Sequence, residues 1–200
     1  SIGGGGFTNK TDKTLDQFVL NQCNKNYFKI GFLATASKDD KKKINLFYNR
    51  FEDTNSQLSH FNLCASSDNF KDWILNKDII YIGGGNTKYM LEIWKKNNLS
   101  QFFKQAYNQG IILSGVSAGA VCWFEWILSD SIGSGLNPLK GINLISGSCT
   151  PHYSEPKRVY QFDLEIKNSK LPAGIGIDDG VAVLFIDGKP SQVYCSRKNH

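Results

Sequence analysis

The sequence predicts a three-layer α/β sandwich with a mainly parallel central sheet and short antiparallel strands at its C-terminal end. Short apolar runs alternate with stretches of helical periodicity, a pattern typical of βαβ units and a parallel sheet. Closely spaced strand-like runs with turn residues between them then fill the last thirty residues. With 200 residues, 40% of them hydrophobic, the chain has the size and composition of one domain, and we expect residues 1–200 to form it.

Each expected element follows from its local pattern. The apolar run over 29–34 predicts a strand, and residues 39–53 predict a helix because Ile44, Phe47 and Phe51 recur at helical spacing. The same reasoning predicts, in chain order, a strand over 60–64, a helix over 69–77, a strand over 78–82, helices over 87–97 and 99–108, and a strand over 111–114.

The second half of the sequence is more mixed. Residues 121–128 are compatible with a helix, and a helix is expected from about 155 to 168. We expect the closing strands over 174–177, 181–186 and 192–195, with Asp187-Gly188 as a hairpin turn.

Composition and charge exclude several function classes. The net charge is +5, and the densest basic run, residues 41–43, lies among acidic residues, so a solvated helix face is favoured over a nucleic-acid surface. No run of 18 apolar residues and no secretory pattern is present, which predicts a soluble protein. The five scattered cysteines form no CxxC pair and indicate reduced thiols in a cytoplasm, without a metal or cofactor.

The motif with the clearest chemical meaning is Gly115-Val116-Ser117-Ala118-Gly119. It follows an expected strand and precedes a helix-compatible run, the setting of a nucleophile elbow. In such a turn the serine hydroxyl is exposed, and the N-terminal amides of the next helix stabilise negative charge. A turn of small residues without chemistry is the alternative.

A second glycine-rich turn, Gly83-Gly84-Gly85-Asn86-Thr87, follows the strand over 78–82. Backbone N–H groups of Gly84 or Gly85, with that of Ala118, are expected to form an oxyanion hole. A dinucleotide fingerprint is excluded, because Lys88 stands where a third glycine is needed and no acid occurs near Phe103. A plain turn capped by Asn86 or Thr87 is compatible with the oxyanion role, and we expect these two residues to contact substrate.

The serine needs a base, and His152 is selected by elimination. His200 is the last residue, and nothing distinctive surrounds His60. His152 lies in a loop before an expected helix, where functional side chains are common.

The acid that would orient the imidazole stays open. Asp130 falls between nucleophile and base in chain order, as in one known triad order. Asp178 and Asp179, between two strands, are also candidates, whereas Glu125 is expected on the helix after the elbow, facing elsewhere.

Together these motifs, with Pro151-His152-Tyr153, resemble the peptidase E family of serine peptidases, which includes aspartyl dipeptidases and cyanophycinases. The resemblance runs from Ile2 to at least Val183 and implies a fold like that of class I glutamine amidotransferases. It implies Ser117 as nucleophile, His152 as base and Asp130 as the acid of the triad. A further acid of the family, often glutamate, matches Asp179.

The resemblance also implies a substrate, a short peptide with an N-terminal aspartate or a β-aspartyl equivalent. Arg158, with Lys157 behind it, is our candidate for binding the substrate carboxylate, because guanidinium binds carboxylates in a bidentate manner. We expect neither nucleic acid nor membrane as a partner, and a homodimer stays open. The family has a strand upstream of Gly3, so we expect a few residues before Ser1.

Two other functions compete with this one. A cyanophycinase-like hydrolase of β-aspartyl-arginine material would need an acidic pocket for the arginine. A non-catalytic binding member of the fold would be favoured if Ser117 and His152 lay too far apart for a hydrogen bond.

Overall fold

The computed structural model describes residues 1–7 and 10–197, so His200 lies outside the described residues. The N-terminal half contains a parallel sheet in the order β2-β1-β3-β4. Its strands are β1 (Phe28–Leu33), β2 (Ser56–His60), β3 (Ile79–Ile82) and β4 (Ile112–Gly115). Because the strands are parallel, their carboxyl ends meet at one edge of the sheet, where ligands of open α/β sheets bind.

A second sheet follows in the order β6-β5-β7-β8. It consists of β5 (Phe124–Ser129), β6 (Asn137–Lys140), β7 (Ile145–Pro151) and β8 (Gly174–Ile177). Strand β7 pairs in parallel with both β5 and β8, and only β6 is antiparallel. Strands β9 (Val181–Ile186) and β10 (Lys189–Cys195) form an antiparallel hairpin, and the predicted turn at Asp187-Gly188 is confirmed by the positive φ of both residues.

Helices cover both faces of the first sheet, which confirms the layered α/β fold. Along β3, Ile79 and Tyr81 pack into one apolar core, whereas Ile80 and Ile82 pack into another on the opposite face, as the two-residue period of a strand requires. The first core includes side chains of α1 (Lys13–Leu20) and α2 (Lys41–Phe51). The second includes side chains of α3 (Phe70–Leu75), α4 (Thr87–Lys96) and α5 (Ser100–Asn108).

Some predicted boundaries are wrong. The strand expected over 60–64 is β2 and ends at His60. Residues 121–128 are not a helix: α6 (Ala118–Val121) has four residues and β5 begins at Phe124, because this aromatic-rich run pairs with β6 and β7. Periodicity alone cannot separate a buried strand from a buried helix in such a run. Strand β8 joins the parallel sheet rather than the antiparallel tail. The remaining helix, α7 (Pro156–Lys167), matches its prediction.

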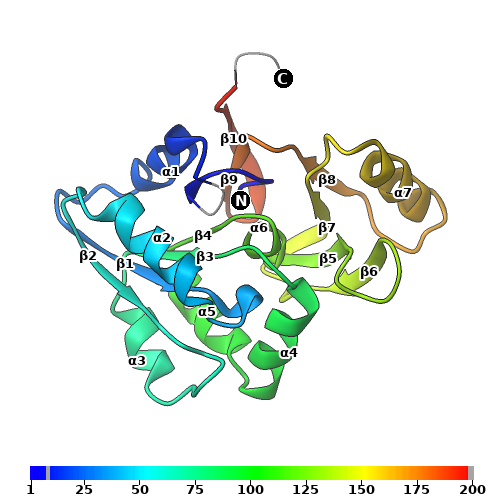
Figure 1. Ribbon diagram of the computed structural model, residues 1–200. Helices are drawn as coiled ribbons and strands as arrows, with labels where there is room; N and C mark the ends of the chain where they lie inside the picture. Colours follow the sequence, from blue (N-terminus) through cyan, green and yellow to red (C-terminus); the bar gives the residue numbers. More distant parts are fainter. Residues whose placement is uncertain (8–9, 198–200) are drawn as a thin grey trace.

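The N-terminal segment connects the two halves of the molecule. Ile2 forms a parallel bridge with Val116 and an antiparallel bridge with Ala182, and Gly4 forms a parallel bridge with Asp179. In Figure 1 the N-terminus accordingly lies at the centre of the molecule, beside the β9–β10 hairpin. The first residues of the chain therefore join the end of β4 to the turn between β8 and β9.

A buried carboxylate anchors α1 to this region. The Asp16 side chain forms an ion pair with Arg50 (3.1 Å) and accepts a hydrogen bond from the Tyr81 hydroxyl (3.1 Å). Asp16 is only 2% exposed, and burial raises its pKa to about 6 from an ordinary value of 3.8. Between these pH values the folded chain keeps a proton that the unfolded chain has lost, so stability falls as the pH rises through this range.

Replacing Asp16 with asparagine should remove this pH dependence. We expect the free energy of unfolding of the wild type, relative to Asp16→Asn, to decrease by up to about 3 kcal/mol between pH 4 and pH 7. Urea unfolding of both proteins across this range measures the difference. A difference that stays constant with pH would show that Asp16 is ionised in the folded state throughout.

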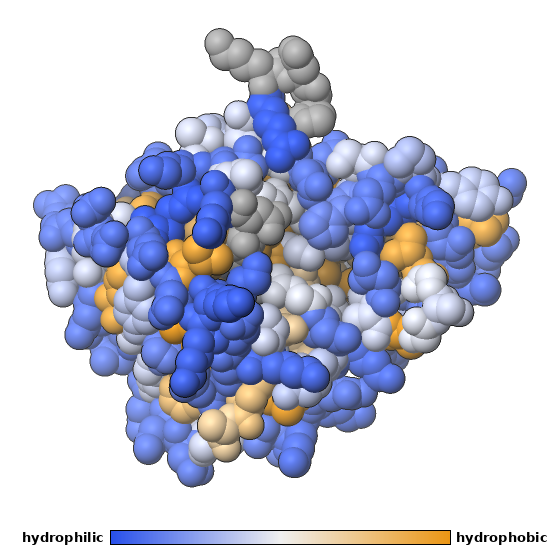
Figure 2. Space-filling view, in the orientation of Figure 1, coloured by the Kyte–Doolittle hydropathy of each residue, from blue (hydrophilic) through white to orange (hydrophobic). Residues whose placement is uncertain are grey.

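The surface seen in this orientation is mostly hydrophilic, with apolar residues in small separate patches (Figure 2). No helix in residues 1–7 and 10–197 has the length and apolar character needed to cross a bilayer.

Candidate active site

Ser117 occupies a strained turn between β4 and α6. Its backbone has φ 53° and ψ −113°, a conformation that non-glycine residues rarely adopt and that is concentrated at functional sites. The flanking glycines permit the turn, because a Cβ at Gly115 would overlap the Gly119 carbonyl and one at Gly119 would overlap the Ile82 carbonyl. This geometry is that of the expected nucleophile elbow.

The glycine turn after β3 lies directly against the elbow. A Cβ at Gly84 would lie 3.2 Å from Ser117 Cβ and 3.8 Å from its Oγ. Within the described part of the chain, the N–H groups of Gly84 and Ala118 have no hydrogen-bond acceptor. Since α6 has only four residues, these individual N–H groups, rather than the dipole of a long helix, are what the site offers to a negative charge.

The other two predicted substrate contacts of this turn, Asn86 and Thr87, differ in their surroundings. The Asn86 side chain caps α4 by accepting a hydrogen bond from the Tyr89 N–H at 2.8 Å, and the Asn86 N–H donates to the Ala36 carbonyl at 2.7 Å. Asn86 is nevertheless exposed, whereas Thr87 is buried. Of the two, only Asn86 lies open to a ligand.

Ser117, His152 and Asp179 form one continuous hydrogen-bonded chain. His152 Nε2 lies 3.0 Å from Ser117 Oγ, and His152 Nδ1 lies 2.5 Å from Asp179 Oδ1. The three residues follow the carboxyl ends of β4, β7 and β8, respectively. The His152 and Asp179 side chains are 24% and 38% exposed, so the chain of hydrogen bonds is open to substrate at the surface.

Asp130 does not contact His152, contrary to the assignment implied by the family resemblance. Its Oδ2 forms an ion pair with Arg158 Nη2 at 2.7 Å. The order of the sheet explains the difference: β7, which leads to His152, lies between β5, which leads to Asp130, and β8, which leads to Asp179. Asp179 lies on the side connected to Ser117 through the N-terminal segment.

Arg158 itself is engaged by two carboxylates. Its side chain is 6% exposed and pairs with Asp130 and, at 3.2 Å, with Glu155. Both carboxylates are exposed at the surface, with 67% and 59% of their side chains accessible. Lys157, by contrast, is exposed.

The remaining candidates lie elsewhere. His60 ends β2, three strand spacings from β4, or roughly 14 Å, and its Nδ1 lies 2.9 Å from the Tyr48 hydroxyl. Glu125 lies on strand β5 rather than on a helix. No group of three or more His, Cys, Asp or Glu side chains in residues 1–7 and 10–197 is arranged to hold a metal ion.

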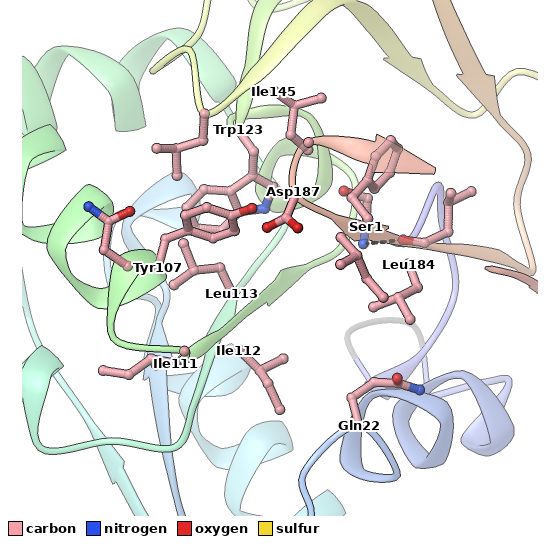
Figure 3. Close-up of a pocket in the computed structure, with 17 residues that line it drawn as sticks. Ser1, Gln22, Tyr107, Ile111, Ile112, Leu113, Trp123, Ile145, Leu184 and Asp187 are labelled. Atoms are coloured by element: carbon pink, nitrogen blue, oxygen red, sulfur yellow. Dashed lines mark hydrogen bonds between the residues drawn. The ribbon is translucent and has the colours of Figure 1, made fainter. Parts of the chain in front are cut away.

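A cavity of about 670 Å³ lies at the opposite end of β4 from Ser117. Its lining includes Ile112 and Leu113 at the start of β4, Trp123, and Asp187 at the β9–β10 turn (Figure 3). Ser117 and His152 do not line it. The hydrogen-bonded chain is therefore located at the surface edge formed by the strand ends, not in this cavity.

The comparison with known families agrees with this geometry. The family model of peptidase family S51 matches residues 1–193 of the chain. The chain belongs to peptidase family S51. This is the peptidase E family that the sequence motifs resemble, and membership in S51 supports a peptidase activity.

Relatives of the S51 chain carry peptidase names without an assigned substrate. The chain is 38% identical over 200 residues to an uncharacterized peptidase, YgaJ, of Bacillus subtilis (strain 168), covering 98% of this chain and 86% of that protein. It is 28% identical over 160 residues to an uncharacterized peptidase, PM1590, of Pasteurella multocida (strain Pm70), covering 74% of each. The crystal structure of a peptidase from an acI-B1 Actinobacterium superposes with a TM-score of 0.67 at 18% identity, covering 97% of this chain and 85% of that one, and so supports the fold.

Proposed function

We propose that this chain is a serine peptidase that hydrolyses short peptides through an acyl-enzyme. The observation that carries the proposal is the 3.0 Å contact between Ser117 Oγ and His152 Nε2, in a protein of a peptidase family. A nucleophile within hydrogen-bond reach of a base, which is itself oriented by a carboxylate, has the geometry of acyl transfer. The same contact argues against a non-catalytic binding protein, which would be favoured only if Ser117 and His152 lay too far apart for a hydrogen bond.

In the first half of the reaction, Ser117 Oγ attacks the peptide carbonyl while His152 Nε2 takes the hydroxyl proton. Asp179 holds the imidazole in the productive tautomer and stabilises its charged form. The N–H groups of Gly84 and Ala118, with Gly85 as a further donor, bind the oxyanion. When the intermediate collapses, the peptide C–N bond breaks and His152 gives its proton to the leaving amine.

In the second half, water replaces the amine. His152 removes a proton from the water, whose oxygen attacks the acyl carbonyl and forms a second tetrahedral intermediate. This intermediate releases the carboxylic acid, and Ser117 regains its proton from His152. No step requires a metal or an organic cofactor.

For the substrate we propose short peptides with an N-terminal aspartate, bound through Arg158. The chemical support is the guanidinium, which lies in the first turn of α7, six residues after His152. Its Nη1 is buried and has no hydrogen-bond partner among the described residues, so the contact with substrate is expected at Nη2 and Nε, which now bind Asp130 and Glu155. Because Asp130 and Glu155 are both exposed, a substrate carboxylate can displace either one without leaving it buried and unpaired.

The experiment is hydrolysis of dipeptides that differ only in the N-terminal residue, aspartate against leucine, alanine and arginine, with β-aspartyl-arginine added. Selective cleavage of the aspartyl dipeptide supports the proposal. Selective cleavage of β-aspartyl-arginine would instead favour the cyanophycinase-like alternative. Cleavage of all these dipeptides at similar rates would support the proposed peptidase activity and contradict the proposed aspartate specificity.

Replacing Arg158 with glutamine tests the proposed carboxylate contact. We expect the preference for aspartate over alanine to fall about 10- to 100-fold, the effect of losing a hydrogen bond to a charged group. The exposed neighbour provides the control, since Lys157→Gln should leave the preference unchanged. An unchanged preference in Arg158→Gln would limit Arg158 to a structural role at the start of α7.

We also propose a cytoplasmic location for this peptidase. All five cysteines have free thiols, as proteins of reducing compartments usually do.

A further inference from the structure

The segment Ile2–Gly4 connects the nucleophile turn to the acid turn through backbone hydrogen bonds. The Ser117 N–H donates to the Ile2 carbonyl at 3.0 Å, and the Gly180 N–H donates to the Gly4 carbonyl at 2.9 Å. The Ile2 N–H donates in turn to the Gly115 carbonyl at 2.9 Å. Three consecutive residues thus fix the backbone on both sides of Val116, directly before Ser117, and next to Asp179.

Gly4 also lies directly against the hydrogen bond between Asp179 and His152. A Cβ placed on Gly4 would overlap Asp179 Oδ1 and would lie within 2.8 Å of both Asp179 Cγ and His152 Nδ1. Real Cβ atoms do not approach other atoms this closely. A side chain at this position would therefore occupy the space in which the two groups meet.

The backbone of Gly4 does not itself require glycine. Its neighbours Gly5 and Gly6 have φ values of 101° and 69°, whereas Gly4 is not among the residues with positive φ. Alanine is therefore allowed at residue 4 by its backbone conformation. What excludes it is the Asp179–His152 pair.

We propose that Gly4 is a positioning residue of the peptidase site, which keeps Asp179 on His152 by the absence of a side chain. This inference rests on the proposed function. The Cα of Gly4 packs against one side of the Asp179 carboxylate. The hydrogen bond from the Gly180 N–H to the Gly4 carbonyl holds the turn that contains Asp179 against Gly4. The nucleophile and the acid are thereby set relative to each other by one short segment.

Replacing Gly4 with alanine should move the Asp179 carboxylate away from His152. A displacement of about 1 Å can lower the rate about 100-fold, and loss of the oriented imidazole lowers it by up to about 10⁴-fold. We therefore expect kcat to fall by a factor between about 100 and about 10⁴. KM should change little, because Gly4 is not part of the proposed substrate-binding contact at Arg158.

A double-mutant cycle separates positioning from a general loss of structure. In an Asp179→Asn background, where His152 is already misoriented, adding Gly4→Ala should change kcat by less than about threefold, because contacting residues are not additive. Equal factors in both backgrounds would overturn the proposal. Gly110→Ala is the control: its φ of 78° makes the substitution strained, but nothing lies within 4 Å of the added Cβ, so it should reduce stability and not kcat.

A variant that fails to fold is also informative. If Gly4→Ala alone does not fold, Gly4→Ala combined with Asp179→Ala should fold, because the overlapping carboxylate is then gone. Failure of this combination would place the conflict elsewhere and overturn the proposal.

Proton NMR of the imidazole tests the positioning without any substrate. The Nδ1 proton of His152, hydrogen-bonded to a carboxylate, should give a downfield signal in the wild type and in Ser117→Ala, and should be absent from Gly4→Ala and Asp179→Asn. A signal unchanged in Gly4→Ala contradicts the role of Gly4. This result stands even if no peptide is cleaved, so the two proposals fail separately.

Discussion

Replacing Ser117 with alanine is expected to lower kcat by about 10⁶-fold, the size of effect found when an activated serine is removed from a triad. The reason is that no other atom at the elbow can form the acyl bond. The fold should be retained, because the elbow is held by backbone hydrogen bonds: the Ser117 N–H donates to the Ile2 carbonyl, and the Ala120 N–H donates to the Ser117 carbonyl at 2.9 Å. Steady-state kinetics and a thermal melt measure the two properties.

Ser114 supplies the matched control on the same strand. Its buried hydroxyl donates to the Ile80 carbonyl at 2.9 Å, so Ser114→Ala should cost about 1 kcal/mol of stability and leave kcat unchanged. A folded Ser117→Ala protein that hydrolyses the peptide with the wild-type kcat would contradict the assignment of Ser117 as the nucleophile.

The second large effect is expected for Asp179. We expect Asp179→Asn to lower kcat by about 10⁴-fold, because the asparagine amide forces the imidazole into the unproductive tautomer. Asp130→Asn is the comparison. Its exposed carboxylate pairs with Arg158 rather than with His152, and Arg158 keeps Glu155 as a partner when Asp130 is replaced, so kcat should change by no more than a few-fold.

Kinetics of the two variants on the same dipeptide decide which acid acts. A larger loss in Asp130→Asn than in Asp179→Asn would mean that His152 changes its carboxylate partner when substrate binds. The structure would then describe a resting arrangement of the site.

The local parts of the site could be predicted from the sequence, because each depends on a short stretch of chain. The elbow around Ser117 needs small residues within five positions, and the glycine turn at Gly84 follows a clearly apolar strand. His152 could be selected because only three histidines are present.

The choice of acid could not be made in this way. It depends on the order β5-β7-β8, which places one candidate acid on each side of His152. That order includes β5, whose residues lie in a run with a pattern that is equally compatible with a helix. A helix over 121–128 would not pair with β7, so the position of Asp130 relative to His152 cannot be derived from the sequence.

The role of Gly4 is hidden from the sequence for a similar reason. The run Gly3–Gly6 is visible, but glycine runs usually indicate turns with positive φ. At Gly4 the requirement comes instead from a carboxylate near the other end of the chain, and only the three-dimensional arrangement brings the two together.

The most direct test of the central claim is capture of the acyl-enzyme. An aspartyl p-nitrophenyl ester, whose activated leaving group speeds acylation relative to deacylation, is mixed with the enzyme, quenched with acid and mapped by peptide mass spectrometry. A Ser117–His152–Asp179 acyl-transfer site predicts an aspartyl adduct on Ser117 that is absent from Ser117→Ala. An adduct on another residue, or the same adduct in the Ser117→Ala protein, would contradict it.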